Sequence, residues 1–247
     1  SRAIHPISIQ PTGPGNPRPT RPDPHFNTLT MPLLLSLRVA ALSALLAAIG
    51  GITLASLLAH KQGLFWHLID GIINLPLVLP PTVLGYYLLI TLSQRSTLGS
   101  WLGNLGIHLT FTWGGAVVAA SIVALPLVTQ SARAAIESVP SELLDVARTL
   151  GRAPLAIFLT ITLPLAWRGV LAGIVLAFAR ALGEFGATLM IAWNIPGQTQ
   201  TLPIAIYDAV QAGETDRANQ LSLLLTSAAI VLLVSIRLLT NRISART

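Results

Sequence analysis

Two opposite charges lie inside an otherwise apolar stretch of the chain. Arg180 and Glu184 are four residues apart, so they share one face of a helix and can form an ion pair. A charged side chain at the centre of a bilayer costs roughly 2.5 to 3.5 kcal/mol on insertion scales, so both must face protein or water. Two interpretations stay open: a structural ion pair inside a helical bundle, or part of a gate or pathway.

The residues that follow this pair are mostly small or carry neutral donors, which allows close helix approach or leaves room for an ion. We expect the segment 183–188 and a loop over 194–207 to form an outer gate, with a solvated connecting loop as the alternative. The candidate pathway residues are Arg180, Gly183, Glu184, Gly186, Thr188 and Asn194. Earlier in the same stretch, Gly169 and Gly173 form a small-residue motif that predicts helix packing.

The segment 131–164 has a second pattern, because it is too polar for a bilayer and too regular for a flexible loop. Pro140 and Ser141 are helix start signals, Gly151 suits a left-handed helix end, and Pro154 lies shortly beyond. The pattern predicts a short amphipathic helix over 138–152, whose partner is a protein groove or the lipid surface. Its apolar stripe has the spacing i, i+3, i+4, i+7 and consists of Leu143, Val146, Ala147 and Leu150.

No enzyme site assembles from the remaining residues. The chain has no cysteine, which excludes thiol nucleophiles and cysteine–zinc sites. It has no GxxxxGK[ST] motif, and no glycine-rich loop precedes its single lysine, Lys61. The histidines show no metal-ligand spacing, and Tyr207-Asp208 lacks the partner aspartate of an intramembrane protease. We therefore expect no catalytic residue, no metal site and no cofactor bound by this chain.

The composition indicates that transmembrane helices position the residues named above. Hydrophobic residues make up 53% of the 247 and charged residues only 10%, whereas soluble domains have about 25% charged residues. A membrane span needs about 20 apolar residues. We therefore predict an all-α integral membrane protein with five transmembrane helices, the second kinked or broken by Pro76, Pro80 and Pro81. The predicted spans are 33–59, 72–93, 109–129, 165–192 and 219–240.

Lysine and arginine residues indicate the orientation, because they concentrate in cytoplasmic loops. The loop 60–71, the connection 130–164 and the C-terminus hold most of them, whereas Arg95 and Arg217 fall on the other side. This predicts a cytoplasmic C-terminus and an external N-terminus. The net charge of +6 comes from single residues with no basic run, so no nucleic-acid partner is expected.

The segment 1–30 differs from the rest of the chain. It holds seven of the seventeen prolines and no apolar run, so we expect a disordered tail ahead of a membrane domain over 31–247. Its three arginines, Arg2, Arg18 and Arg21, oppose the predicted orientation. The first methionine is Met31, so one interpretation is that the native chain starts there.

The predicted amphipathic helix carries a resemblance to a known family. Asp145-Val146-Ala147, three residues, Gly151, nine residues and Ile161-Thr162-Leu163-Pro164 resemble the cytoplasmic loop signature of ABC importer permeases. That signature is Glu-Ala-Ala, three residues, Gly, nine residues, Ile-x-Leu-Pro; here the spacing is intact, while Asp145 and Val146 depart from it. The resemblance implies a type I permease fold, with this helix as a coupling helix in a groove of an ATP-binding subunit. The implied coupling residues are Glu142, Asp145, Ala147, Leu150, Gly151, Ile161, Leu163 and Pro164.

Four further segments look like the molybdate permease subfamily, and the resemblance covers about 33–242. These segments are 75–86, 111–116, 179–190 and 194–203. Sulfate permeases share the Gly-Glu-aromatic-Gly part at 183–186, so sulfate/thiosulfate or tungstate is the alternative substrate. Trp193 stands where the subfamily pattern has a small residue.

The resemblance also implies partners. It implies a homodimeric permease in the bacterial inner membrane, with two ATP-binding subunits that hold ATP and Mg, and a periplasmic or lipid-anchored oxyanion-binding protein. Membrane lipid would surround it. An ion channel or membrane scaffold, a different class, would not need the spacing over 145–164.

Overall fold

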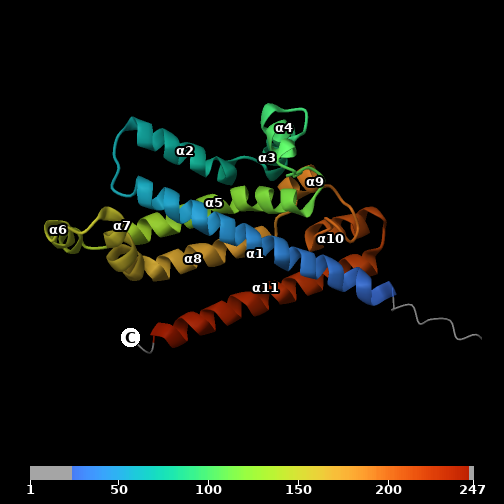
Figure 1. Cartoon of the computed structure of the whole chain (residues 1–247). Helices are drawn as coiled ribbons and strands as arrows, with labels where there is room; N and C mark the ends of the chain where they lie inside the picture. The colour runs from blue at the N-terminus through green and yellow to red at the C-terminus, as the bar shows by residue number, and fades with distance from the viewer. Residues whose placement is uncertain (1–23, 245–247) are drawn as a thin grey trace, which may run out of the picture.

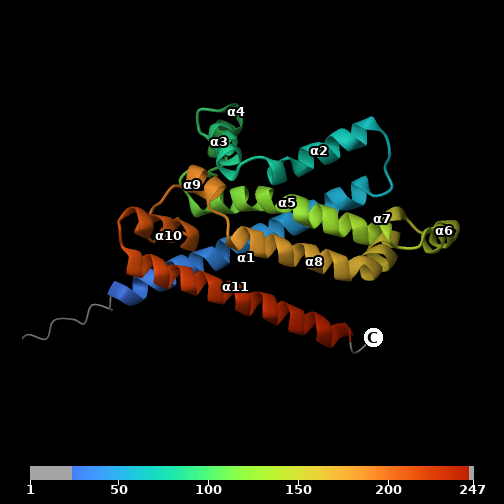
Figure 2. The ribbon, with the colours of Figure 1, turned by 180° about the vertical axis from the view of Figure 1, so that it is seen from behind.

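The computed structural model describes residues 24–244, and their side chains over 29–235. Four long helices dominate it: α1 (Pro24–Leu58), α5 (Trp113–Glu137), α8 (Leu163–Leu182) and α11 (Thr215–Ser244). Figures 1 and 2 show α1, α5 and α8 side by side, whereas α11 diverges from them toward the C-terminus. Of the disordered tail predicted over 1–30, residues 1–23 lie outside the described residues. The prediction was wrong for residues 24–30, because α1 already begins at Pro24.

Small residues fill the interface between the long helices. A β-carbon added at Gly169 would lie 2.5 Å from the β-carbon of Ala135, and one at Gly173 would lie 2.9 Å from that of Ser131. The glycine motif of α8 therefore packs against α5, as predicted, and lets the two backbones approach closely. The alanines that are 0% exposed within this bundle are Ala40, Ala55, Ala116, Ala119, Ala120, Ala124, Ala132 and Ala177.

The second predicted span is broken. Helix α2 (Leu64–Val78) and helix α3 (Pro81–Leu92) meet at an angle of 113°. Pro80 caps α3 and Pro81 is its first residue, where the missing N–H costs nothing. The predicted break is thus confirmed, and α2 begins at Leu64, before the predicted start of the span at residue 72.

Helix α5 runs eight residues beyond its predicted end at residue 129, to Glu137. This last part of the helix is packed on one side, because Ala132 and Ile136 are buried in the cluster that includes Ala166 and Val170 of α8. Its polar residues are paired, since Arg133 lies 2.8 Å from Glu137. Arg133 also lies 3.3 Å from Asp70 and so ties α2 to α5. The connection predicted over 131–164 is therefore shorter than expected.

The fourth span also has different ends. Helix α7 (Pro154–Ile157), the π-helical turn η1 (Phe158–Thr162) and α8 form one apolar helix over 154–182, instead of the predicted 165–192. In η1 the N–H of Leu163 bonds to the carbonyl of Phe158, five residues back. Pro164 is the second residue after this turn and has no N–H to donate, so the local hydrogen-bond pattern has to change.

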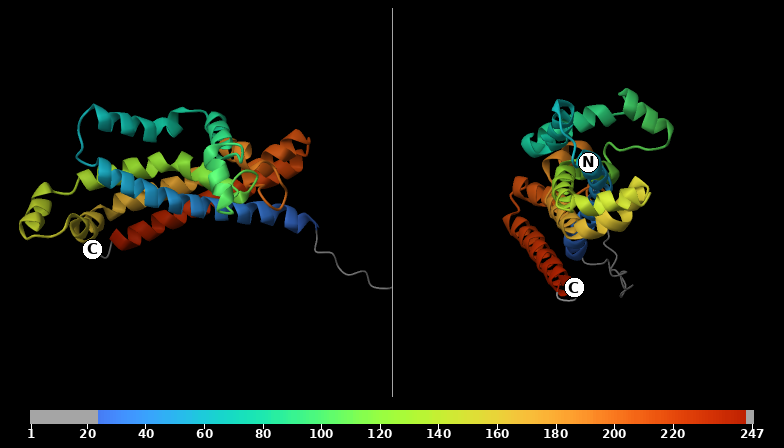
Figure 3. Two further views of the ribbon diagram at one scale, coloured as in Figure 1. Left: turned by 45° about the horizontal axis from the view of Figure 1, so that its top comes forward. Right: turned by 90° about the vertical axis from the view of Figure 1, so that its left-hand side faces the viewer.

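The short helices gather at the two ends of the bundle (Figure 3). Helices α4 (Thr97–Asn104), α9 (Gly186–Ala192) and α10 (Leu202–Gln211) lie at one end, and α6 (Ser141–Thr149) lies at the other. The predicted loop over 194–207 thus ends where α10 begins. Among the described residues, four helices can cross a membrane by length and composition, or five if α2 and α3 count as one span.

Two glycines give a matched test of the packing between α5 and α8. Gly173→Ala should destabilise the protein by about 1–3 kcal/mol, because the new β-carbon meets Ser131. Gly71→Ala in α2 should be neutral or stabilising by up to about 1 kcal/mol, because nothing lies within 4 Å of its β-carbon. Thermal unfolding in detergent measures both changes; equal melting temperatures for the two variants would contradict this account of the interface.

Candidate functional site

Helix α6 projects from one end of the bundle (Figure 1) and has a well-defined end. Gly151 has a φ of +75°, its N–H bonds to the carbonyl of Arg148 at 2.9 Å, and the N–H of Arg152 bonds to that of Ala147 at 3.2 Å. These two bonds make a Schellman motif, which satisfies carbonyls that the helix leaves open. The predicted helix and its left-handed glycine are both confirmed.

The two sides of α6 have different surroundings. Leu144 and Ala147 are buried in one cluster with residues of α1, α5, α7 and α8. Leu143, Val146 and Leu150 are 48%, 58% and 77% exposed. Three of the four predicted stripe residues therefore form an open apolar surface, and the prediction was wrong for Ala147, which faces the bundle.

Charged residues flank this open surface. Asp145 and Arg148 form an exposed ion pair at 2.7 Å, and Glu142 is exposed in the first turn of α6. The remaining predicted coupling residues lie at the base of the long fourth helix: Ile161 and Leu163 pack against the cluster of Leu144 and Ala147. Pro164 is exposed at the start of α8.

The predicted ion pair lies near the opposite end of α8. The guanidinium of Arg180 is 2.7 Å from Oε2 of Glu184, whose side chain is 1% exposed, compared with 33% for Arg180. The two residues do not share one continuous helix as predicted, because α8 ends at Leu182. Glu184 lies in the break before α9, and its Oε1 accepts the N–H of Ala187 at 2.8 Å. The carboxylate therefore pairs with α8 and caps α9.

The predicted pathway residues around the pair come together, but their donors are occupied. Gly186 lies where α9 meets α3, since a β-carbon there would be 3.0 Å from Pro81. Gly183 is exposed at the end of α8. Thr188 is buried, and its hydroxyl donates to the carbonyl of Phe185 at 2.9 Å.

Asn194 is held by residues that the sequence did not single out as its partners. Its Nδ2 donates to Oδ1 of Asp208 at 2.9 Å, and its Oδ1 accepts from Nε2 of Gln200 at 2.9 Å. Asp208 is on α10, so this network fixes the loop between α9 and α10. Both polar residues are visible in the sequence, but only the fold brings them to Asn194.

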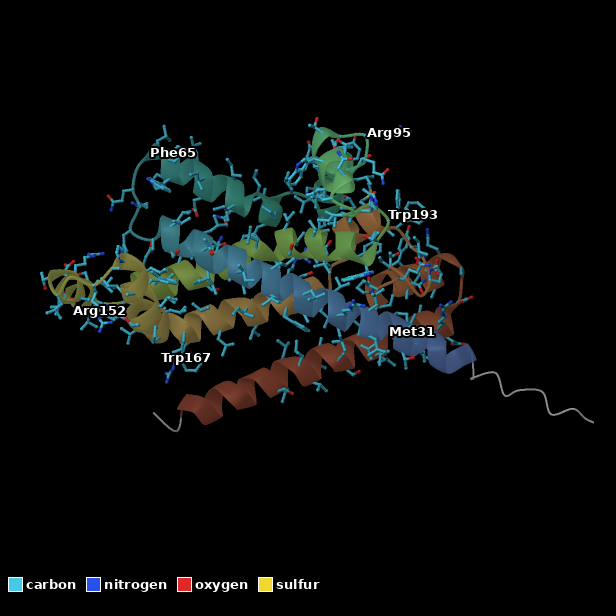
Figure 4. All side chains as sticks on the ribbon, in the orientation of Figure 1. Met31, Phe65, Arg95, Arg152, Trp167 and Trp193 are labelled. Atoms are coloured by element: carbon cyan, nitrogen blue, oxygen red, sulfur yellow. The ribbon has the colours of Figure 1, made fainter. Side chains whose placement is uncertain are left out.

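Trp193 ends α9 in an uncommon backbone conformation. Its φ is +61°, a region that glycine adopts easily and a tryptophan adopts only with strain, and its side chain is 59% exposed. This explains why a small residue is expected there. The side chain lies at the same end of the bundle as Arg95 (Figure 4).

Comparison with known proteins gives consistent matches. The family model described as "Binding-protein-dependent transport system inner membrane component" matches residues 51–247. The molybdenum transport system permease protein ModB of Escherichia coli K12 is 44% identical over 206 residues, which are 82% of this chain and 90% of the relative. ModB of Haemophilus influenzae is 44% identical over 213 residues, 86% of this chain and 92% of the relative.

Solved structures show the same fold at low sequence identity. A bacterial ABC transporter that imports the acidic polysaccharide alginate matches with a TM-score of 0.72 at 18% identity, over 92% of this chain and 85% of the other. An inward-facing MetNI methionine ABC transporter matches with a TM-score of 0.70 at 16% identity, over 90% of this chain and 99% of the other.

The buried ion pair can be tested by comparing single and double variants. Arg180→Ala should destabilise the protein by about 3–5 kcal/mol, because it leaves the buried Glu184 carboxylate without its partner. The double variant with Glu184→Ala should lose less, although it also loses the cap on Ala187. Yield and thermal unfolding in detergent measure the difference.

The exposed pair of Asp145 and Arg148 provides the control for this experiment. Replacing Arg148 by alanine should cost at most about 1 kcal/mol, since both residues of this pair are solvated. If Arg180→Ala behaved like Arg148→Ala, then Glu184 would have access to water and its buried position would be wrong.

Proposed function

The chain belongs to the family of binding-protein-dependent transport system inner membrane components, and on this premise we propose that it is the membrane-spanning permease subunit of an ATP-driven molybdate importer. The observation that carries the proposal is α6, which has the family's signature spacing and an open apolar surface. This chain would bind no nucleotide. ATP and Mg would be held by two copies of a partner ATPase.

The distribution of basic residues supports a cytoplasmic position for α6. Figure 4 shows Arg152 at the α6 end of the bundle and Arg95 at the opposite end. Lys61, Arg148 and Arg168 also belong to the loops and helix ends near α6. Because basic residues concentrate on the cytoplasmic side, we assign the α6 end and the C-terminus to the cytoplasm.

The buried cluster beneath α6 gives a route for motion from the ATPase into the membrane. When the ATPase moves α6, Leu144 and Ala147 press on residues of α7, η1 and α8. Helix α8 then runs across the bundle to Arg180, which pairs with Glu184 at the break before α9. We propose that this break, with Gly183, Gly186, Thr188 and Asn194 around it, belongs to the outer gate and pathway.

A single copy offers little to enclose an anion pathway. It has at most five spans among the described residues, and many of its large apolar side chains face outward. A homodimer would place two copies of the break around a common axis. The substrate-binding protein would deliver the anion at the end that holds α4, α9 and α10.

The similarity to molybdenum transport permeases supports molybdate as the substrate, and an uptake experiment tests this assignment. The permease, reconstituted with its ATPase and binding protein, should take up labelled molybdate only when ATP is present. Excess tungstate should compete because its size and charge match, whereas equal sulfate should not. If the protein took up sulfate and not molybdate, the substrate would be sulfate and the molybdate assignment would be wrong. Uptake without ATP would indicate a channel and contradict the proposal.

The coupling role of α6 can be tested at Gly151. Gly151→Val should reduce assembly with the ATPase and transport-coupled ATP hydrolysis, because a β-branched residue at a φ of +75° costs roughly 1–2 kcal/mol and distorts the end of α6. No atom lies within 4 Å of the new β-carbon, so the effect is conformational.

Gly213 is a matched control for this variant. It has a φ of +74°, its added β-carbon also meets nothing within 4 Å, and it lies between α10 and α11 at the other end of the bundle. Gly213→Val should lose similar stability but keep ATPase assembly. Normal coupling in Gly151→Val would remove α6 from the mechanism.

A further inference from the structure

A cavity of about 450 Å³ lies behind α6, on its bundle side. It is formed by the end of α1, the end of α5, the inner side of α6, and the segment that leads through α7 into η1. Leu144 and Arg148 of α6 both line it. The cavity is thus separate from the open apolar surface of Leu143, Val146 and Leu150, and also from the break at Glu184.

The ionisable residues that line this cavity are basic. Among the described lining residues, these are His60, Lys61 and Arg148, while Ser56 and Thr162 contribute hydroxyl groups. Two of these positions are next to acids: Asp145 pairs with Arg148, and Glu137, which pairs with Arg133, also accepts the N–H of His60 at 3.4 Å. The unpaired positive charge of the described lining is therefore that of Lys61. Lys61 forms no salt bridge within residues 29–235, and its ammonium lies 5.5 Å from the centre of the Trp66 ring. The cavity therefore suits a ligand with negative charge.

The backbone around the cavity is irregular at two separate places. His60 has a φ of +60°, which is uncommon for a residue other than glycine. Across the cavity, Phe158 and Thr162 belong to the π-helical turn η1. Both kinds of irregularity are enriched at functional sites, so their meeting at one cavity is a second observation in favour of a binding site.

Apart from the basic and hydroxyl residues, the walls of the cavity are apolar. Ala59, Ile136, Ile157 and Phe158 line it, and all four lie near the ends of helices that cross the membrane. A soluble anion would gain nothing from such walls, whereas a phospholipid offers a charged phosphate to the basic residues and apolar groups to the walls. Basic pockets between helices on the cytoplasmic side are suited to anionic headgroups.

We propose that this cavity binds the headgroup of an anionic phospholipid such as phosphatidylglycerol. The lipid's phosphate lies against Lys61, His60 and Arg148, and its glycerol and upper acyl chain lie against Ile157 and Phe158. The lipid touches the inner side of α6, whose outer side is open to a partner. Anionic lipid therefore stabilises the position of α6 on the bundle. This inference does not depend on which anion is transported.

Native mass spectrometry of the detergent-extracted permease tests the proposal. After removal of endogenous lipid, the protein is equilibrated with phosphatidylglycerol or phosphatidylcholine, and the bound lipid is counted. The variant His60→Asn/Lys61→Gln should retain phosphatidylglycerol about fivefold less well or worse than the wild type, with phosphatidylcholine unchanged. Asparagine is chosen at residue 60 because it tolerates a positive φ.

Two control variants separate charge at the cavity from charge in general. Arg95→Gln removes an exposed charge at the opposite end and should retain phosphatidylglycerol like the wild type. Lys61→Arg keeps the charge and should also retain it. Equal retention by the wild type and the double variant would overturn the proposal, as would loss in Lys61→Arg. If inorganic phosphate bound to the lipid-free protein with the same dependence on Lys61, the site would belong to a soluble anion and the lipid assignment would fall.

Discussion

A helix that breaks inside a membrane leaves backbone groups that water does not reach, and this constraint governs the interior of the protein. The break between α8 and α9 depends on one side chain. Glu184 accepts the N–H of Ala187 with one oxygen and pairs with Arg180 through the other. Arg180 on α8 thus compensates the charge of Glu184, and the same carboxylate caps the start of α9. The break before α3 meets the same constraint differently, because Pro81 has no N–H that needs a partner.

Helix α8 connects the two parts of the site because of how its two ends are built. The N-terminal end of α8 continues from the π-helical turn η1, which precedes Pro164 and adjoins the buried cluster under α6. Its C-terminal end is Leu182, and the ion pair of Arg180 and Glu184 joins it to α9. Between these ends Gly169 and Gly173 hold it against α5 at close distance. In the coupling route that we propose, this close contact with α5 favours a displacement of α8 as a whole over local bending.

Local signals in the sequence were sufficient for some features and not for others. Proline and glycine predicted the break at Pro80 and the end of α6 at Gly151, because both depend only on the backbone of a few residues. Hydropathy misplaced the end of α5, since Arg133 is polar in sequence but is paired with Asp70 from a different helix. Hydropathy also merged α8 with α9, because the pairing that allows Glu184 into the interior appears only in three dimensions. The bonds of Asn194 to Asp208 and Gln200 were missed for the same reason.

Strained backbone in this protein lies at junctions between elements. Among the described residues, those other than glycine with positive φ are His60, Phe111 and Trp193. Phe111 donates its N–H to the carbonyl of Ile191 in α9, and Thr199 donates its hydroxyl to the carbonyl of Trp193. The N–H of His60 donates to Glu137 at 3.4 Å, so each strained position is tied to a neighbouring segment or residue. Such conformations cost about 1–3 kcal/mol each and persist only when their surroundings hold them. Phe111 lies in the loop between α4 and α5, and Trp193 lies in the loop between α9 and α10. A change in the position of α9 would therefore have to break the hydrogen bonds that hold these two strained positions.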